Sequence, residues 1–359
     1  MHIALVIGTR PQIIKSAPII TESKKHNINI SIIHTGQHYD YQLSKVFFNE
    51  LSLPDPYINL GIGSSPHVQQ IATMMLDLEP VYKKLRPDLV LVPGDTNSTL
   101  AGALTAIKMK IPTYHIESGA RSFDMNMPEE VNRRIVDHIS TKLYTVSNNG
   151  ITNLLNEGLI NIRLVGDTMY ESILQHTKDI ENAQTYKKYD LIPKSYCVLT
   201  LHRENNVNDI IKLNTIMRAL IQTKSRIIFP CHPHTKQILT TLNLPTAQEK
   251  LDIIEPLPYF DMLNLVKNAK VVITDSGGLQ KEAYWLGTQC VTLRSTTEWT
   301  ETIDIGVNTL VGSDPQKIIS GIDKALKTEY QDNGRSSSLL IPYASKNILE
   351  DIRNIYERY

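Results

Sequence analysis

Short runs of Val, Ile and Leu alternate along the chain with longer segments whose apolar residues have helical spacing. Continuous apolar runs of this length are typical of strands that are buried on both faces of a parallel sheet. This alternation of strands and helices predicts an α/β protein with doubly wound sheets. The predicted strands are Ile3–Ile7, Ile30–His34, Leu89–Val92, Thr113–Ile116, Leu143–Thr145 and Arg163–Val165 in the first half, and Cys197–Thr200, Arg226–Phe229, Leu251–Ile254, Lys270–Thr274 and Gln289–Leu293 in the second.

The length of the chain predicts two domains. At 359 residues the chain is too long for a single hydrophobic core of ordinary size. The boundary is expected after the last strand of the first half, which gives domains of residues 1–167 and 168–344. The remaining segment, Ser345–Tyr359, has helical apolar spacing at Ile348, Ile352 and Ile355, and we expect it to pack back on the first domain.

The composition narrows the function classes. The chain has 37 basic and 37 acidic residues, which argues against nucleic acid as a partner. Apolar runs stay below the ~18 residues that a membrane span requires, and Met1-His2 leads directly into a predicted strand without the pattern of a signal peptide. The three cysteines are isolated from one another and odd in number, which favours a reducing, cytoplasmic environment.

A Ser-Gly-Gly turn in the second half predicts a phosphate site. The segment from Val271 to Ala283 reads as a buried strand, a tight turn at Ser276, Gly277 and Gly278, and a helix. The N–H groups at a helix N-terminus favour an anion, and adjacent glycines allow a phosphate to approach the backbone. Glu282 falls about one turn into this helix, within reach of ribose hydroxyls. The alternative is an ordinary strand-to-helix turn.

A second turn of this type lies at the N-terminus. The strand Ile3–Ile7 ends at Gly8, and Pro11 suits the first turn of a helix. Arg10 and Lys15 flank this helix start and are predicted to hold phosphate oxygens. The glycine patterns of dinucleotide dehydrogenases and P-loop NTPases are both missing from the sequence. Two turns, one in each half, predict a diphosphate held between two doubly wound domains.

Carboxylates follow the predicted strands of the first half, where ligands bind in open α/β sheets. Asp95 comes soon after Leu89–Val92, and Glu117 follows Thr113–Ile116 directly. Glu129 and Glu130 open a predicted helix. N-capping is the structural alternative for Asp95, and interaction with the helix dipole is the alternative for Glu130.

Histidines mark the strand ends of the second half. His202 and Arg203 follow Cys197–Thr200 and are suited to phosphate binding or proton transfer. His232 and His234 follow another strand, but their spacing does not resemble a metal site, so we predict no metal and assign His232 to the substrate site. Without the pattern of a nucleophilic Ser or Cys, these residues suit proton transfer coupled to loss of a stabilised leaving group.

Six motifs, in this order, resemble the non-hydrolysing UDP-N-acetylglucosamine 2-epimerase family. The match extends over nearly the whole chain, and Pro11 favours the non-hydrolysing branch. The motifs are Gly8-Thr9-Arg10-Pro11, Gly94-Asp95-Thr96, Glu117-Ser118-Gly119-Ala120-Arg121, Pro128-Glu129-Glu130-Val131-Asn132-Arg133, Thr200-Leu201-His202-Arg203 and Asp275-Ser276-Gly277-Gly278-Leu279-Gln280.

The resemblance implies a fold, a reaction and a set of site residues. It implies two Rossmann-like domains of the glycosyltransferase-B type with the active site in the interdomain cleft, a homodimer, a UDP-sugar substrate, and no metal or nicotinamide cofactor. The implied reaction removes the C2 proton as UDP leaves C1, and then adds UDP back to a 2-acetamidoglucal intermediate. The implied catalytic residues are Asp95, Glu117, Glu129 and His202, and the UDP-binding residues are Arg10, Lys15, Arg203, His232, Ser276, Gly277, Gly278 and Glu282. Which carboxylate serves which face of C2 stays open.

Some positions depart from the commonest family pattern. Gln12 replaces a Glu, Trp299 replaces an Arg, Glu204 stands one place early, and Tyr39-Asp40-Tyr41 replaces an Arg-Glu-Met run. All of these except Glu204 resemble the branch that acts on UDP-2,3-diacetamido-2,3-dideoxyglucuronate, so this sugar is the alternative substrate. Trp299 is expected either to pack on a C3 acetamido group or to fill the domain interface. Allosteric control by UDP-N-acetylglucosamine also stays open.

Two other function classes compete with an epimerase. A glycosyltransferase of the same architecture would release UDP only in the presence of an acceptor. A nucleotide-sugar-binding protein without activity would not require Asp95, Glu117 and Glu129, all of which this chain retains. Both alternatives rest on fold-level analogy.

Overall fold

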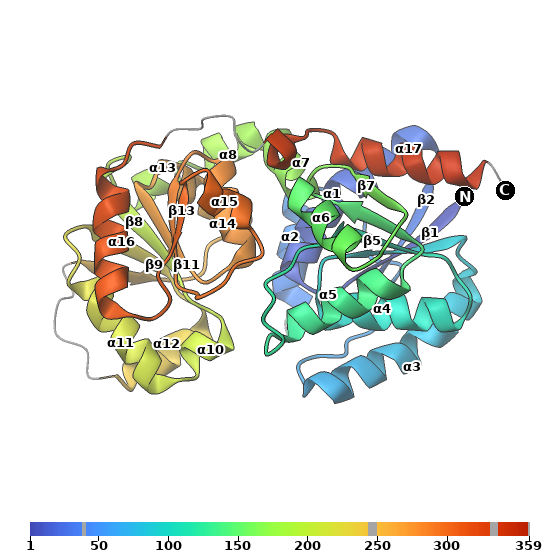
Figure 1. Cartoon of the computed structure of the whole chain (residues 1–359), viewed down its shortest axis with the longest axis horizontal. Coiled ribbons are helices and arrows are strands. Elements are labelled where there is room, and N and C mark those ends of the chain that lie inside the picture. Colours follow the sequence, from blue (N-terminus) through green and yellow to red (C-terminus); the bar gives the residue numbers. More distant parts are fainter. Residues whose placement is uncertain (38–40, 243–249, 331–336, 358–359) are drawn as a thin grey trace. The chain divides into compact units, whose positions relative to one another are not determined.

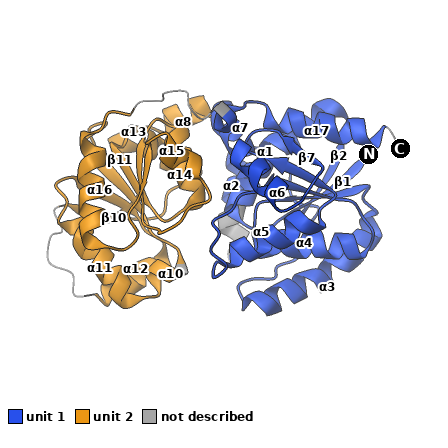
Figure 2. Cartoon of the chain, viewed as in Figure 1, with its two compact units in different colours: residues 1–175, 337–359 blue, residues 176–336 orange. Residues whose placement is uncertain are grey.

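The computed structural model describes residues 1–37, 41–242, 250–330 and 337–357, so the predicted departure at Tyr39 and Asp40 lies outside the described residues. The chain forms two compact units (Figure 2). Unit 1 comprises residues 1–175 and 337–359, and unit 2 comprises residues 176–336. The units therefore divide at residue 175, where the sequence suggested 167, and the C-terminal segment belongs to unit 1.

Unit 1 contains a parallel sheet. In its described residues this sheet has seven strands in the order β3-β2-β1-β4-β5-β6-β7. The inner strand β1 is buried from Ile3 onwards, as expected of a strand covered by helices on both faces. The strands are β1 (His2–Ile7), β2 (Asn29–His34), β3 (Ile58–Asn59), β4 (Leu89–Pro93), β5 (Thr113–Ser118), β6 (Lys142–Thr145) and β7 (Ile162–Leu164).

Two helical layers cover this sheet, with α1, α7 and α17 packed together on one face and α3, α4 and α5 on the other (Figure 1). Because α17 packs on α1 and α7, the C-terminal segment is part of the first layer. The α-helices of unit 1 are α1 (Arg10–Ser23), α2 (Tyr41–Glu50), α3 (His67–Leu85), α4 (Asn97–Lys108), α5 (Pro128–Ile139), α6 (Asn148–Asn156), α7 (Thr168–Gln175) and α17 (Ala344–Tyr356).

Unit 2 repeats this plan with a parallel sheet that has six described strands, in the order β10-β9-β8-β11-β12-β13. Its strands are β8 (Tyr196–Thr200), β9 (Arg226–Pro230), β10 (Leu251–Ile254), β11 (Val271–Thr274), β12 (Gln289–Thr292) and β13 (Asn308–Leu310). Its helices are α8 (Thr177–Ala183), α9 (Thr185–Lys188), α10 (Glu204–Val207), α11 (Ile210–Ile221), α12 (Pro233–Thr240), α13 (Tyr259–Asn268), α14 (Gly277–Trp285), α15 (Thr300–Asp304) and α16 (Pro315–Lys327).

The strand order reverses once in each sheet. In unit 1 the reversal lies between β1 and β4, and in unit 2 between β8 and β11. Ligands of open α/β sheets bind beyond the carboxyl ends of the strands at such a reversal. The predicted site residues of each unit gather at and beside these strand ends.

The predicted α/β class and doubly wound sheets are confirmed. Each predicted strand is present within one or two residues, while the short edge strands β3 and β13 were not predicted. Both are only two or three residues long, too short for a recognisable hydrophobic period. In the described part of the chain, no helix is long and apolar enough to cross a membrane.

Candidate active site

The first turn of α1 carries Arg10 and is held by a buried amide. Thr9 is the N-cap residue, and Pro11 occupies the first turn, as predicted. The Gln12 amide accepts from Gly8 N–H at 2.8 Å and donates to the Pro93 carbonyl at 2.9 Å, which joins the loop after β1 to the end of β4. A carboxylate in this position could not donate to Pro93, so Gln12 is explained by loop bracing. Arg10 is exposed, with its guanidinium carbon 4.6 Å from the Phe47 ring centroid.

Lys15 and Glu117 form a buried ion pair. The Lys15 ammonium lies 2.6 Å from Glu117 Oε1, and both side chains are more than nine-tenths buried. Glu117 adopts a left-handed φ of 68°, at an irregularity in the pairing of β5 with β6. Such a conformation is strained for a residue with a side chain and is found mainly at functional sites. Lys15, predicted to hold phosphate, is placed against a predicted catalytic carboxylate.

Asp95 is not the N-cap of α4. Thr96 caps that helix in a capping box with Thr99, which leaves the Asp95 carboxylate available for other contacts. Asp95 Oδ2 lies 2.6 Å from Arg133 Nη1, and its side chain is 25% exposed. Burial raises the pKa of Asp95 above its ordinary value, although Arg133 and Lys15 oppose this effect. The carboxyl group is therefore shifted toward holding a proton.

The two glutamates at the start of α5 have different surroundings. Glu129 is half-buried and acts electrostatically on Asp95, so it belongs to the same group of charges. Glu130 is fully buried and accepts hydrogen bonds from Ser122, Arg133 and Arg134. The predicted alternative for Glu130, a helix-dipole contact, therefore accounts for only part of its surroundings.

His115 and Asp137 form a buried hydrogen-bonded pair beside the carboxyl ends of β4 and β5. His115 is fully buried, with Nδ1 2.7 Å from Asp137 Oδ1 and Nε2 2.7 Å from the Gly94 carbonyl oxygen. Asp137 also pairs with Arg121 at 2.7 Å and accepts from Gly119 N–H. Burial alone would raise the pKa of Asp137, but His115 and Arg121 outweigh it and hold the pKa below its ordinary value.

In unit 2 a single buried carboxylate organises the loop after β8. Asp275 accepts from the backbone N–H groups of His202 and Arg203 and from the Asn206 amide. Burial would raise the pKa of Asp275, but the His202 ring, 3.2 Å away, and these donors lower it. The His202 side chain is 53% exposed and so is open to a ligand. Arg203 is turned inward, with Nε 3.1 Å from the Asp275 carbonyl oxygen.

The Ser-Gly-Gly turn opens a helix as predicted. Ser276 is the N-cap residue of α14, and its hydroxyl accepts from Leu279 N–H at 3.4 Å. Gly277 and Gly278 form the first two helical positions, so their N–H groups have no acceptor one turn earlier in the helix. Glu282 is buried, and its carboxylate accepts from the Tyr259 hydroxyl at 3.0 Å.

His232 has a local structural role. It is the N-cap of α12, and its Nδ1 accepts from His234 N–H at 3.3 Å. Burial, His234 and His202 lower its pKa, so the neutral ring is favoured and His232 lies within electrostatic range of His202. Among the described residues, no group of three or more His, Cys, Asp or Glu side chains is placed to hold a metal ion.

Trp299 is buried within unit 2. It is 4% exposed, and the Lys281 ammonium lies 3.7 Å from its ring centroid and 5.5 Å from that of Trp285. A Cβ on Gly277 would lie 3.5 Å from Trp299 Nε1, so the indole backs the phosphate-type turn. One face of the ring is thus occupied by Lys281 and not by a sugar.

Several residues of these two sites were missed from the sequence. Arg133 and Asp275 contact the predicted site residues Asp95 and His202, and Asp137 holds His115 beside them. The spacing of Glu130 with Arg133 and Arg134 was a usable signal, because residues three and four apart share a helix face. Asp275 opens one of the six quoted motifs, but no local signal marks Asp137, whose partner His115 is 22 positions away in the sequence.

Comparison with known proteins agrees with this geometry. The family model described as UDP-N-acetylglucosamine 2-epimerase matches residues 21–354. The UDP-N-acetylglucosamine 2-epimerase of Methanocaldococcus jannaschii is 42% identical over 95% of this chain and 98% of that protein. The UDP-2,3-diacetamido-2,3-dideoxy-D-glucuronate 2-epimerase of Pseudomonas aeruginosa is 37% identical over 96% of this chain and all of that protein.

Solved structures give the same result. The M. jannaschii enzyme in complex with UDP-GlcNAc and UDP matches with a TM-score of 0.91 and 40% identity, over 99% of this chain and all of that one. A Rickettsia africae glycosyltransferase, at 15% identity and a TM-score of 0.59 over 99% of this chain and 98% of that one, shares the fold alone, which is of the glycosyltransferase-B type. The chain therefore belongs to the UDP-N-acetylglucosamine 2-epimerase family.

Proposed function

We propose that this chain interconverts UDP-N-acetylglucosamine and UDP-N-acetylmannosamine. A base removes the C2 proton, the electron pair forms a C1–C2 double bond, and the C1–O bond to UDP breaks. UDP then adds back to C1 of the 2-acetamidoglucal, and an acid delivers a proton to the opposite face of C2. The reaction is balanced without a redox cofactor or a second substrate.

The observation that supports this proposal is the carboxylate group at the strand ends of unit 1. Inversion at one carbon requires a base and an acid on different faces. Asp95 is partly exposed and shifted toward the protonated form, while Glu117 is buried against the Lys15 ammonium. Glu129 completes the group. Carboxyl groups in such different surroundings are suited to different proton-transfer roles.

We assign the nucleotide to unit 2. The proposed diphosphate ligands in this unit are the N–H groups of Gly277 and Gly278, which follow the N-cap Ser276, and the exposed His202. Because the leaving UDP gains charge as the C1–O bond breaks, donors at this position stabilise the transition state. Glu282 is the proposed ribose ligand, with its carboxylate oriented by Tyr259.

Solvent exchange tests the reaction. UDP-N-acetylglucosamine incubated with the enzyme in heavy water should gain deuterium at C2 without an acceptor or added cofactor, as followed by NMR. Release of UDP only when an acceptor is supplied would instead indicate a glycosyltransferase. Tight UDP-sugar binding with neither exchange nor UDP release would indicate a binding protein.

One alternative substrate is UDP-2,3-diacetamido-2,3-dideoxyglucuronate. It is favoured by the 37% identity to the P. aeruginosa 2-epimerase named for that sugar. If it is the true substrate, its kcat/KM should exceed that of UDP-N-acetylglucosamine at least ~10-fold, or about 1.4 kcal/mol in transition-state binding. Equal or reversed values would leave the simpler sugar as the substrate.

We further propose that the chain acts as a cytoplasmic homodimer. Two features support this: the three cysteines are free and buried, and Val68 and Leu76 on α3 are 83% and 71% exposed. Light scattering coupled to gel filtration measures the mass in solution. A mass of one chain across micromolar concentrations would contradict the dimer.

A further inference from the structure

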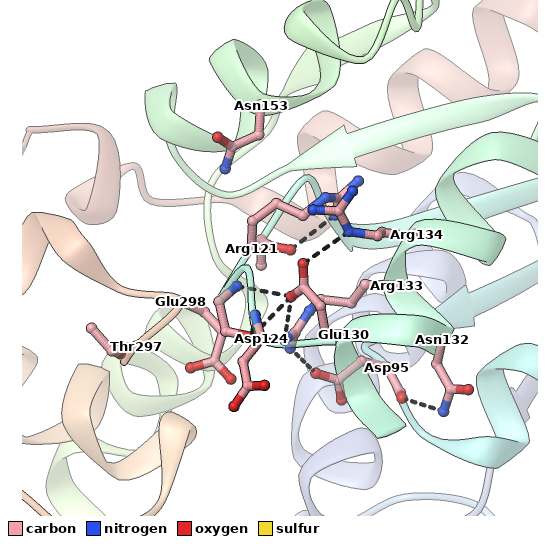
Figure 3. A network of polar contacts seen from close by, with 12 residues as sticks. Asp95, Arg121, Asp124, Glu130, Asn132, Arg133, Arg134, Asn153, Thr297 and Glu298 are labelled. Atoms are coloured by element: carbon pink, nitrogen blue, oxygen red, sulfur yellow. Dashed lines mark hydrogen bonds and ion pairs between the residues drawn. The ribbon is translucent and has the colours of Figure 1, made fainter. Parts of the chain in front are cut away.

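A fully buried carboxylate lies just behind the candidate acid–base group. Glu130 on α5 accepts from Ser122 N–H at 2.8 Å and from the Ser122 hydroxyl at 3.0 Å. It also accepts from Arg133 Nη2 at 3.0 Å and from Arg134 Nε at 3.1 Å (Figure 3). These donors outweigh the effect of burial, which alone would raise the pKa of Glu130, and hold that pKa below its ordinary value.

Arg133 bridges Glu130 and Asp95. Its Nη1 lies 2.6 Å from Asp95 Oδ2, and its Nη2 lies 3.0 Å from Glu130 Oε2 (Figure 3). A guanidinium is planar and rigid, so two carboxylates on different nitrogens fix both its position and its plane. Without Glu130, the Arg133 guanidinium would lose one of the two carboxylates that fix its position and plane.

The helix start alone does not explain this arrangement. A Glu at the third helical position commonly reaches back to the N-cap N–H. Glu130 instead bonds forward to Arg133 and Arg134, and across to the loop at Ser122. The neighbouring Asn132 donates to the Asp95 carbonyl oxygen at 2.9 Å, so the same helical turn holds the backbone of Asp95 as well.

We propose that Glu130 is a positioning residue of the epimerase reaction. It holds the Arg133 guanidinium in place, and thereby fixes both the direction of the Asp95 carboxyl group and the positive charge beside it. This inference rests on the proposed function, because the role of Asp95 is part of it. Glu130 itself acts through Arg133 and does not touch the reacting atoms.

The charge of Glu130 also affects Asp95, through its pairing with Arg133. The charged groups that act on Asp95 are Arg133 and Glu129 from α5, Lys15 from α1 and Glu117 from β5. A neutral residue at 130 leaves the positive charge of Arg133 less compensated. The anionic form of Asp95 is then favoured, so its pKa falls and the limb of the rate profile that reports Asp95 moves to lower pH.

The test compares two matched glutamates of one network. Glu157 accepts from Arg121 at 2.8–2.9 Å and lies 3.6 Å from Arg134. Glu130→Gln should lower kcat ~10- to 100-fold, the scale of a misplaced catalytic group, with a small change in KM. The limb of its pH–rate profile that reports Asp95 should move to lower pH. Glu157→Gln should keep kcat within about 2-fold and leave the pH profile unchanged.

A charge-retaining variant separates position from charge. Glu130→Asp keeps the negative charge but shortens the reach to Arg133. Its kcat should fall while its pH limb stays near the wild-type value. Circular dichroism and thermal unfolding identify a variant that has not folded. If Glu130→Gln does not fold, the kcat of Glu130→Asp is the result that tests the inference. A wild-type kcat in Glu130→Asp would overturn the inference. So would equal losses of kcat in Glu130→Gln and Glu157→Gln if both variants keep the pH profile of the wild type.

The two proposals fail in different ways. If the wild-type protein exchanges no deuterium into the substrate, the proposed function fails. The effect of Glu130 on Asp95 can still be tested without activity, by following the Asp95 carboxyl carbon in an NMR pH titration. The signal of this carbon is the one that disappears in Asp95→Asn. A lower pKa in Glu130→Gln than in the wild type supports the inference, and an unchanged value refutes it.

Discussion

The two units share one topology but differ in how the buried carboxylates nearest the reversal of strand order are held. In unit 1, buried side-chain charges are paired with one another, as in Lys15 with Glu117 and Arg133 with Asp95. In unit 2, the fully buried carboxylate of Asp275, which follows β11, accepts from the backbone N–H groups of His202 and Arg203. The helix that follows β11 begins with glycines whose N–H groups are free for an anion.

This difference separates two chemical tasks. Proton transfer needs side chains whose pKa values can be adjusted, and buried charge pairs provide that adjustment. Binding a diphosphate needs fixed donors, which backbone amides provide without a change in protonation. The same sheet order therefore supports either task, depending on which side chains follow the strands. The four predictions below test this contrast.

The largest effect is expected at the buried ion pairs of unit 1. Asp137→Asn removes the negative charge between His115 and Arg121, both fully buried at this point. Breaking a buried pair leaves an uncompensated charge and should cost ~3–5 kcal/mol of unfolding free energy. Urea unfolding measures this loss. Asp88→Asn, at an exposed carboxylate that accepts from His2 N–H, is the control and should cost about 0.5 kcal/mol or less.

Asp95→Asn should affect chemistry more than binding. The amide oxygen still accepts from Arg133 Nη1, so the local structure should persist. Loss of an acid–base group should lower turnover ~10²-fold or more, while UDP affinity, measured by calorimetry, changes little. Equal losses of turnover and UDP affinity would instead make Asp95 a nucleotide ligand, and the contrast between the units would fail.

A smaller effect is expected for the backbone-bound carboxylate of unit 2. Asp275→Asn should cost ~1–3 kcal/mol at neutral pH, because it leaves buried donors imperfectly paired. The folded-state pKa of Asp275 lies below its ordinary value of 3.8, so its contribution is present above that value and is lost as the pH falls through the lowered pKa.

The pH series gives the sign of this effect. Unfolding free energies of the wild type and Asp275→Asn, measured from about pH 7 to about pH 3, should converge at the acidic end. A difference that stays constant over this range would show that Asp275 contributes through shape and not through charge.

The smallest effect concerns the cation beside the phosphate-type turn. Lys281→Met removes the ammonium 3.7 Å from the Trp299 ring but keeps a similar volume, and should cost ~0.5–2 kcal/mol. The chain has two tryptophans, so Trp285→Phe leaves Trp299 as the single tryptophan, whose emission can be excited selectively at long wavelength. In that background, Lys281→Met should change the emission of Trp299. An unchanged spectrum would contradict the contact.

The sequence determined the sheets and the ends at which ligands bind. Continuous apolar runs predicted each of the longer strands, because a parallel strand is buried on both faces. Pro11 and the Ser276 turn predicted the starts of α1 and α14, since N-terminal helix signals act within a few residues. The edge strands β3 and β13 were too short for such a signal.

Only the tertiary structure decided which charges meet. Lys15 and Glu117 are 102 positions apart in the sequence, and Asp95 and Arg133 are 38 positions apart, yet each pair lies 2.6 Å apart. No local pattern encodes such contacts, because they depend on how the strand ends are aligned at one edge of the sheet. Tertiary packing also turned Lys15 toward a carboxylate and buried Trp299 against Lys281.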